Sequence, residues 1–192
     1  MRSPIYWHPL LYRLTLRALY GDALSARFDA VLPLIAAAGG DSLLDVCAGD
    51  GAIRHRLPAG MRYVPLDGNL SFVEALRDAG LPAVWLDVRS DPLPRADVVL
   101  MMGSLYHFVP EQRWIVEKLR AAAKKRLIIV EPHVNWSAKG GVLGKIAQWA
   151  SDPGIERSHL GRLGQDDLQA LVDTTHPTAV QRLEREWVIV WD

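Results

Sequence analysis

The sequence predicts an α/β fold whose mostly parallel sheet ends in an antiparallel hairpin. Five short apolar segments between residues 42 and 130 alternate with helical patterns, which is typical of parallel strands joined by crossover helices. Each of these segments ends at an acidic residue or at a turn that contains glycine. The last two strand-like segments are separated by a turn too short to hold a crossover helix, so we expect them to pair antiparallel.

The predicted strands are short and apolar, as expected of strands that are covered on both faces. We expect strands at residues 42–46, 62–66, 83–86, 96–102, 126–130, 179–183 and 187–191. A short helix that ends by residue 58 is expected between the first two strands. Further helices are expected at 71–79, from 110 through 119, at 140–150 and at 165–172, with a loop at 151–164. The spacing of Ser71 and Glu74 is that of a capping box, so a helix is expected to begin at Ser71.

The first 39 residues predict a helical cap on a single domain that spans residues 1–192. The apolar helix that begins near Pro9 is interrupted by charged side chains. It therefore predicts neither a membrane-spanning helix nor a signal peptide, and we expect a cytoplasmic protein. A second helix is expected over residues 25–38, with a kink at Pro33. Three roles stay open for the first helix: a cover on the sheet, a lid over a bound ligand, and peripheral contact with a membrane surface.

Composition and charge exclude several classes of protein. The 192 residues are 49% hydrophobic and 23% charged, which excludes a disordered or low-complexity chain. Lys and Arg together number 22, as do Asp and Glu, so no net basic charge points to a nucleic-acid partner. The single cysteine, Cys47, excludes a disulfide framework and a multi-cysteine zinc site within the chain, and we expect no bound metal. The sequence predicts no particular oligomeric state.

Polar residues gather directly after the predicted strands. Such positions are occupied by residues 45–51, Asp67, Asp87, residues 103–107 and residues 131–135. Ligands of open α/β sheets bind beyond the carboxyl ends of the strands. The sequence therefore predicts a ligand site at this edge of the sheet.

The turn after the first predicted strand favours a ligand that carries positive charge. Gly49 and Gly51 allow the backbone to pass close to a ligand. The G-x-G-x-x-G dinucleotide fingerprint fails because its last position is Arg54, and the chain has no P-loop motif. Asp50 would repel a pyrophosphate at the start of the following helix.

Two further carboxylates indicate an adenosine group. Asp67 ends the second predicted strand, where a carboxylate can accept hydrogen bonds from both hydroxyls of a ribose. Asp87 ends the third, where a carboxylate can accept from an exocyclic amine such as that of adenine. The sequence thus predicts an adenosine ligand, bound without a phosphate cradle beside an acidic loop.

These motifs resemble those of the class I S-adenosylmethionine-dependent methyltransferases, closely over about residues 40–135 and more loosely over the tail. Residues 43–51 resemble the family's D-x-G-x-G-x-G motif, with Cys47 in place of its first glycine, and residues 101–108 resemble its motif after the fourth strand. The resemblance implies a Rossmann-like three-layer sandwich with a seven-stranded sheet, and S-adenosyl-L-methionine as the cofactor, with S-adenosyl-L-homocysteine as its product. The cofactor-binding candidates are Asp45, Cys47, Ala48, Gly49, Gly51, Asp67, Gly68, Asn69, Asp87, Val88, Met102 and Gly103.

The catalytic candidates follow the fourth and fifth predicted strands. His107, beside Tyr106, is the first candidate for a general base, and a role in shaping the pocket is the alternative. Glu131 and His133 are candidates for an acid/base pair, and a polar strand end is the alternative. Cys47 has no partner for a catalytic dyad and is interpreted as a small packed residue.

The resemblance implies methyl transfer to a small-molecule or lipid-like acceptor, by in-line displacement at the sulfonium methyl. Two other functions stay open, namely an NAD(P)-dependent oxidoreductase on the same architecture and a cofactor-binding protein without catalysis. Of the seven tryptophans, the core is expected to hold Trp114, Trp149 and Trp187, and segments beside the pocket are expected to hold Trp7 and Trp136.

Overall fold

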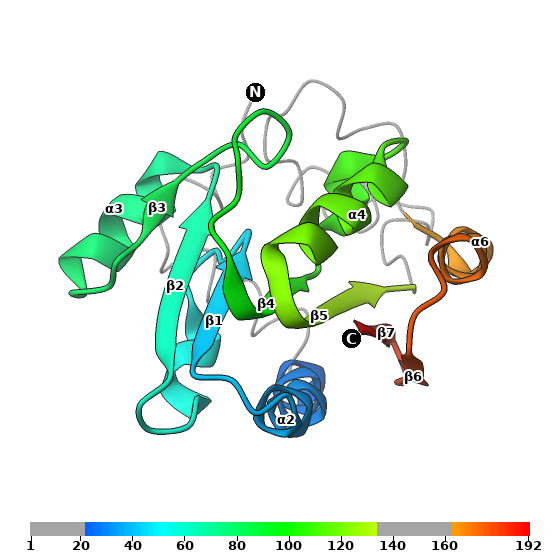
Figure 1. Cartoon of the computed structure of the whole chain (residues 1–192), viewed down its shortest axis with the longest axis horizontal. Coiled ribbons are helices and arrows are strands. Elements are labelled where there is room, and N and C mark those ends of the chain that lie inside the picture. Colours follow the sequence, from blue (N-terminus) through cyan, green and yellow to red (C-terminus); the bar gives the residue numbers. More distant parts are fainter. Residues whose placement is uncertain (1–21, 134–162) are drawn as a thin grey trace, which may run out of the picture.

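The computed structural model of the chain describes residues 22–133 and 163–192 (Figure 1). Within these residues, a seven-stranded sheet has the strand order β3-β2-β1-β4-β5-β7-β6. Strands β1 to β5 pair in parallel, and β7 pairs antiparallel with both β5 and β6, which confirms the predicted fold class. The strands are β1 (Ser42–Val46), β2 (Arg62–Asp67), β3 (Val84–Trp85), β4 (Ala96–Met102), β5 (Ala123–Pro132), β6 (Ala179–Arg182) and β7 (Glu186–Trp191).

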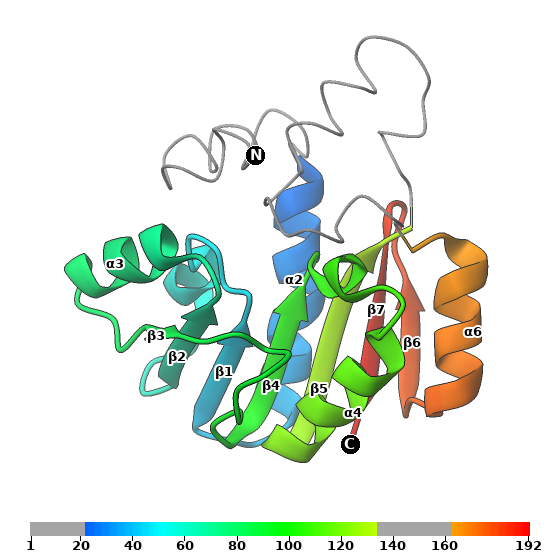
Figure 2. The same cartoon turned by 90° about the horizontal axis from the view of Figure 1, so that it is seen from above.

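Helices cover both faces of the sheet, which makes three layers (Figure 2). Helix α2 packs on one face, and α4 and α6 pack on the other. Helix α3 lies against β2 and β3, at the edge of the sheet. The helical elements are α2 (Asp22–Ala37), η2 (Ala52–Arg56), α3 (Leu70–Asp78), η3 (Leu105–Phe108), α4 (Gln112–Ala122) and α6 (Gln165–Thr175), of which η2 and η3 are single 3₁₀ segments.

The core forms two apolar layers because successive residues of a strand point to opposite faces of the sheet. In β4, Val98 and Leu100 pack in the layer under α2, whereas Val99 and Met101 pack in the layer under α4 and α6. All four side chains are fully buried. This two-sided burial explains the apolar run from Val98 to Met102 in β4, whose predicted bounds match the observed ones.

Several predicted element boundaries differ from the observed ones, and three of them have a clear physical reason. Helix α3 has Asn69 as its N-cap, and the Asn69 side chain accepts a hydrogen bond from the Ser71 backbone N–H at 3.1 Å, so the helix does not begin with a capping box at Ser71. Strand β5 begins three residues earlier than predicted because Ala123 still pairs with Ala96 of β4. Strand β3 is shorter than predicted because only Val84–Trp85 pair with β2.

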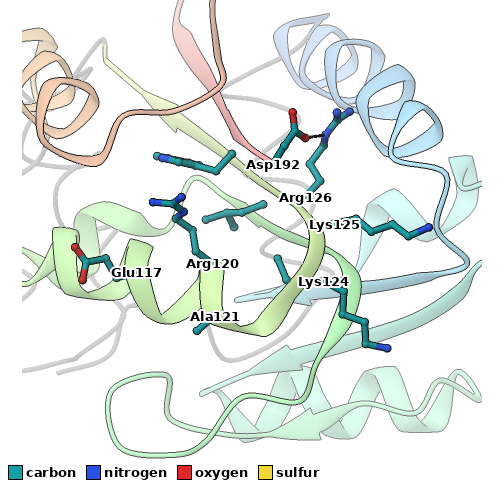
Figure 3. Close-up of a pocket in the computed structure, with 10 residues that line it drawn as sticks. Glu117, Arg120, Ala121, Lys124, Lys125, Arg126 and Asp192 are labelled. Carbon is teal, nitrogen blue, oxygen red and sulfur yellow. Dashed lines mark hydrogen bonds and ion pairs between the residues drawn. The ribbon is translucent and has the colours of Figure 1, made fainter.

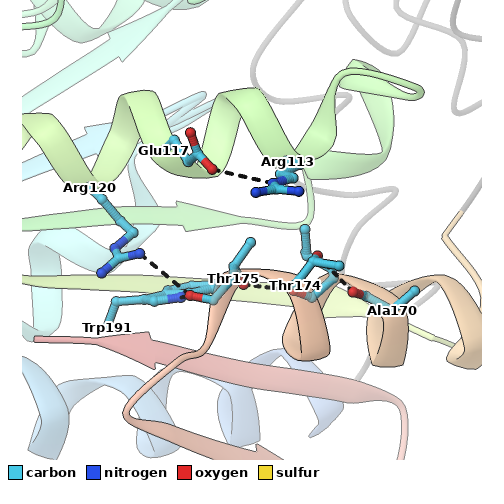
Figure 4. Close-up of polar contacts among 8 residues, drawn as sticks. Arg113, Glu117, Arg120, Ala170, Thr174, Thr175 and Trp191 are labelled. Atoms are coloured by element: carbon cyan, nitrogen blue, oxygen red, sulfur yellow. Dashed lines mark hydrogen bonds and ion pairs between the residues drawn. The ribbon is translucent and has the colours of Figure 1, made fainter.

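The C-terminal end of α6 is tied to β7 and to α4 through one backbone carbonyl (Figure 4). The carbonyl oxygen of Thr175 accepts hydrogen bonds from Trp191 Nε1 at 3.2 Å and from Arg120 Nη1 at 3.4 Å. A cation is favoured at this position because the C-terminal end of a helix carries partial negative charge. These bonds attach α6 to the antiparallel part of the sheet.

The structure separates the predictions for the tryptophans. Trp187 is buried, as predicted, but the prediction of a core position for Trp114 is wrong, because Trp114 is 48% exposed on α4. Lys118 covers its ring, with Nζ 5.1 Å from the ring centroid.

Helix α2 contains Pro33 and continues beyond it to Ala37. The remaining predictions fall outside the described residues, namely those for the first helix, for the segments at 140–150 and 151–162, and for Trp7, Trp136 and Trp149.

None of the helices within the described part of the chain is both long enough and apolar enough to span a membrane.

Candidate cofactor site

The turn after β1 contains three residues in the left-handed conformation. Cys47, Gly49 and Gly51 have φ angles of 59°, 56° and 60°. The Ala48 backbone N–H donates to the Leu66 carbonyl at 3.0 Å, which ties the turn to the end of β2. The turn after β1 is therefore held beside the end of β2, which carries the predicted ribose contact Asp67.

Gly51 is required by the packing beneath this turn. A Cβ atom at Gly51 would lie 2.9 Å from Leu76 Cδ2 and 3.0 Å from Tyr63 Oη, so these side chains would have to shift, and the φ of 60° would strain any other residue. The Tyr63 hydroxyl in turn donates a hydrogen bond of 2.7 Å to Asp45 Oδ2. Both Tyr63 and Asp45 are buried, so this pair forms part of the floor of the turn.

Contact between Asp45 and the cofactor stays a prediction. The surroundings of Asp45 do affect the protonation of its carboxyl group. Burial is the main cause that raises the pKa of Asp45 to about 7, and the nearby Asp67 and Asp50 raise it further. The hydrogen bond from Tyr63 opposes this shift. The folded protein therefore favours the protonated form of Asp45.

This shift predicts a falling stability as the pH rises. The pKa of Asp45 is 3.8 in the unfolded reference and about 7 in the fold, so between these values the folded state binds the additional proton. The free energy of unfolding should fall with rising pH in this window, by up to about 1.4 kcal/mol per pH unit for this group. Urea denaturation at several pH values would measure the slope. The Asp45→Asn variant, which is neutral at every pH, should have a shallower slope, and an unchanged slope would contradict the assignment.

Cys47 occupies a backbone conformation that favours glycine. Its φ of 59° is in the left-handed region, which costs a residue with a Cβ atom about 1–2 kcal/mol. Its half-buried side chain packs against the core under α4. Burial raises the pKa of the Cys47 thiol, so the group stays protonated and packed, in agreement with the interpretation as a structural residue.

A branched side chain at this position is expected to destabilise the protein. Cys47→Val should lower the free energy of unfolding by about 2 kcal/mol, because a β-branched residue tolerates positive φ poorly. Cys47→Ala is the matched control, because it removes the thiol without adding a branch. Urea denaturation would compare the two variants, and equal stabilities would show that the left-handed conformation at position 47 does not matter.

Asp67 is held by two backbone N–H groups. Its Oδ2 accepts from the Gly49 N–H at 2.9 Å, and its Oδ1 accepts from the Asn69 N–H at 2.8 Å. Burial raises the pKa of Asp67, and these two bonds lower it. A carboxylate offers about four lone-pair positions, so about two remain for a ligand. One further lone pair on each oxygen matches the pair of neighbouring hydroxyls of a ribose.

Four carboxylates from four different segments lie close to Cys47. After burial, the groups that raise the pKa of its thiol are Asp67, Asp45, Asp87 and Glu131. These residues belong to β1, β2, β5 and the loop after β3, and they meet at the carboxyl edge of the sheet. This edge therefore gathers four carboxyl groups from distant parts of the sequence. Within residues 22–133 and 163–192, no group of three or more His, Cys, Asp or Glu side chains could hold a metal ion.

The adenine-side candidates occupy the loop after β3. The Asp87 side chain is exposed, and its Oδ1 accepts from the Arg89 backbone N–H at 2.9 Å. Its backbone N–H donates to Asp91 Oδ2 at 2.8 Å. Val88 is buried in the core. Gly68 is exposed after β2, and its carbonyl accepts from Trp85 Nε1 at 3.0 Å.

Glu131 holds the turn that carries Tyr106 and His107. It is fully buried, its Oε2 accepts from the Leu105 N–H at 3.0 Å, and its Oε1 accepts from the Tyr106 N–H at 3.2 Å. Burial raises the pKa of Glu131 to about 8, against the effect of these two bonds. Glu131 and His133 were predicted as an acid/base pair, but the structure directs both Glu131 oxygens to η3, and no hydrogen bond joins the two side chains in the described part of the chain.

The other two catalytic candidates lie together on η3. The rings of Tyr106 and His107 are 3.9 Å apart between centroids and are inclined by 42°. Both residues are half-buried at the carboxyl edge. His133 lies two residues beyond Glu131, and its Nδ1 is buried and has no hydrogen-bond partner among the described residues.

A buried ion pair that the sequence analysis missed lies behind this edge. Arg27 of α2 pairs with Glu186 at the start of β7, and Arg27 Nε lies 3.0 Å from each carboxylate oxygen. Gly103 has a φ of 59°, and a Cβ atom there would lie 3.6 Å from two nitrogens of the Arg27 guanidinium. Met102, just before it, packs in the layer under α2. No local pattern could have predicted this pair, because its members are 159 residues apart.

A depression of about 440 Å³ lies at the opposite edge of the sheet, at the start of β5 and the end of β7 (Figure 3). Its charged lining consists of Arg120, Lys124, Lys125, Arg126, Glu117 and Asp192. Arg126 Nε donates to Asp192 Oδ1 at 2.6 Å, and Lys125 Nζ donates to the Gly39 carbonyl at 2.6 Å. These cations tie chain segments together, and the depression contains none of the predicted cofactor contacts.

Solved structures with this fold are known, although no protein-family model and no curated protein sequence matches the chain. Magnesium protoporphyrin IX methyltransferase from Synechocystis PCC 6803, with bound SAH, is 17% identical over 86% of this chain and 81% of that one, with a TM-score of 0.61. Human N-acetylserotonin methyltransferase, in complex with SAM, is 15% identical over 97% of this chain and 57% of that one, with a TM-score of 0.63.

The plantazolicin methyltransferase BamL, in complex with a substrate analogue and SAH, is 11% identical over 96% of this chain and 92% of that one, with a TM-score of 0.64. These identities are too low to transfer an activity, but the shared architecture extends over nearly the whole chain. The seven-stranded sheet with its antiparallel C-terminal hairpin is thus the fold of the class I S-adenosylmethionine-dependent methyltransferases.

Proposed function

We propose that the chain is an S-adenosylmethionine-dependent methyltransferase. The observation that carries the proposal is the carboxyl edge of the sheet, where the carboxyl groups of four different segments lie near Cys47. A positive charge favours the ionised form of nearby carboxyl groups, so this edge suits a sulfonium ligand. A pyrophosphate at the same place would oppose ionisation of these carboxyl groups, which argues against a nicotinamide dinucleotide.

The residues present fit the adenosine part of this cofactor. Asp67 is oriented by the N–H groups of Gly49 and Asn69, and it retains acceptor positions for two ribose hydroxyls. Asp87 is exposed in the loop after β3, where it can accept from an adenine amine. When bound, S-adenosylmethionine supplies a methyl group on a positively charged sulfur, so the protein needs no covalent nucleophile.

The protein's part in catalysis is to hold an acceptor and to move its proton. Tyr106 and His107 lie on η3, the turn that Glu131 holds through two backbone N–H groups. For a hydroxyl or protonated amine acceptor, we assign the general-base role to His107. Glu131 is fully buried and bonded to backbone N–H groups, so its role here is to position η3. A small-molecule or lipid-like acceptor is proposed. The similar structures, which include N-acetylserotonin and plantazolicin methyltransferases, support the small-molecule class.

The role of His107 predicts a large kinetic effect. His107→Ala should lower the maximal rate of methyl transfer at least about 100-fold, which corresponds to about 2.7 kcal/mol, with cofactor affinity unchanged. Transfer of a radiolabelled methyl group from S-adenosylmethionine to a panel of hydroxyl and amine acceptors would measure it. The exposed His55 provides the control variant His55→Ala. A loss below tenfold would show that no base is needed at this position.

Calorimetric titration tests the proposed function directly. The chain should bind S-adenosylmethionine and S-adenosylhomocysteine with micromolar affinity, and NADH at least about tenfold more weakly. Tighter binding of NADH would favour the oxidoreductase alternative. Binding of the two sulfur ligands without transfer to any acceptor would favour a cofactor-binding protein without catalysis. Failure of both sulfur ligands to bind would overturn the proposal.

A further inference from the structure

Arg89 belongs to no recognisable motif, yet it forms hydrogen bonds with three parts of the candidate site. Its backbone N–H donates to Asp87 Oδ1 at 2.9 Å. Its Nη2 donates to the His107 carbonyl at 2.7 Å, and its Nε donates to Glu111 Oε2 at 3.2 Å. One residue therefore joins the loop after β3, the turn η3 and the segment that enters α4.

The environment of Arg89 suits a positioning role. The side chain is 26% exposed, and its Cζ lies 4.7 Å from the centroid of the Phe108 ring. Its own carbonyl accepts from Lys118 Nζ at 3.3 Å. A planar guanidinium donates in two directions at fixed angles and stacks on an aromatic ring, which a lysine cannot do. The contacts therefore specify arginine rather than any cation.

The turn that Arg89 contacts depends on outside partners for its geometry. Residues 105–108 form a single 3₁₀ turn, which has few internal hydrogen bonds of good geometry. Glu131 accepts from the N–H groups at its start, and Arg89 donates to the His107 carbonyl near its end. Because the turn is held at both ends, the positions of Tyr106 and His107 depend on Arg89.

The other end of Arg89 lies at the predicted adenine contact. Asp87 is held by the Arg89 backbone on one side and by Asp91 on the other. We propose that Arg89 is a positioning residue that couples the adenosine end of the cofactor site to the Tyr106–His107 turn. This inference rests on the proposed function. A ligand on Asp87 restrains the backbone at residue 89. The guanidinium transmits this restraint to η3, so the acceptor side becomes ordered when the cofactor is bound.

Hydrogen exchange of the whole chain, measured by mass spectrometry with and without S-adenosylhomocysteine, tests the coupling. In the wild type, the ligand should slow exchange at least about threefold both in residues 87–91 and in residues 103–111. In Arg89→Gln the ligand should still slow residues 87–91, but the slowing in residues 103–111 should be less than half as large. Arg113→Gln, the same substitution at an exposed position of α4, should behave as the wild type does.

The ligand-free arm is read separately. Arg89→Gln should exchange at least about threefold faster than the wild type in residues 103–111, with β4 and β5 unchanged. Faster exchange everywhere in Arg89→Gln would indicate general destabilisation and overturn the positioning role. In that case Glu111→Gln, which changes only the acceptor of Arg89 Nε, supplies a milder variant for the same exchange comparison. Equal ligand-linked slowing in Arg89→Gln and the wild type would overturn the coupling. If S-adenosylhomocysteine does not bind the wild type, the proposed function and the coupling built on it both fail, while the ligand-free arm still decides whether Arg89 holds the turn.

Discussion

Substitution of Asp67 by asparagine is expected to weaken S-adenosylmethionine binding at least about 100-fold. An asparagine has one acceptor oxygen, so its amide group would face one of the two N–H groups of Gly49 and Asn69 that now donate to the carboxylate. The ribose would also lose a charged acceptor, and hydrogen bonds to charged groups contribute about 1.5–3 kcal/mol each. Calorimetric titration of the variant with S-adenosylmethionine measures this loss.

Asp78→Asn, the same substitution at an exposed position near the end of α3, is the matched control. It should bind the ligand with the affinity of the wild type. Thermal melting of both variants would show whether the fold is retained. Binding by Asp67→Asn within tenfold of the wild type would remove Asp67 from the ribose site, and the ligand would then have to contact the turn in another way.

Glu131→Ala is expected to lower the free energy of unfolding by about 3 kcal/mol. The variant leaves the N–H groups of Leu105 and Tyr106 without their acceptor, and each buried N–H that loses its partner costs about 1–3 kcal/mol. Urea denaturation at about pH 7 would measure the change, because Glu131, with a pKa of about 8, is then largely protonated in the fold. Glu131→Gln keeps one acceptor oxygen but turns its NH₂ group toward the other N–H, so it should lose less stability than Glu131→Ala without matching the wild type.

Glu117→Ala is the control for this substitution. Glu117 lies exposed on α4, paired with Arg113 at 3.3 Å, and surface pairs of this kind contribute little. Its loss should change the free energy of unfolding by less than about 0.5 kcal/mol. A loss below about 1 kcal/mol for Glu131→Ala would mean that η3 finds other partners, and the positioning role of Glu131 would be withdrawn.

Several features of the fold could be predicted from the sequence because their signals are local. Strand β4 was predicted over its observed bounds, since a strand that is buried on both faces is apolar along most of its length, as residues 98–102 are. The antiparallel pairing of β6 and β7 could be predicted because the turn between them is too short to hold a crossover helix. Asp67 lies at the end of its strand, where the topology of a parallel sheet brings ligand contacts together.

Other predictions failed where a second segment decides the outcome. Trp114 has a helical apolar spacing, but the face of α4 on which it lies is left uncovered, so it is 48% exposed. Ser71 has the spacing of a capping box, but Asn69 supplies the cap two residues earlier. Both patterns are compatible with more than one structure, and the packing of the neighbouring elements selects one of them.

By itself, the sequence determined the alternation of strands and helices and the acidic edge that suits a positively charged adenosine ligand. Only the tertiary structure decided which polar groups bond across that edge. Glu131 was a candidate for an acid/base pair with His133, and that role stays a prediction, but only the fold shows that both Glu131 oxygens accept from the N–H groups of η3. The Arg27–Glu186 pair and the contacts of Arg89 join segments that are distant along the chain. The physical reason is that the partner and the burial of a charged side chain depend on what the folded chain brings beside it, whereas strand and turn propensities depend on adjacent residues.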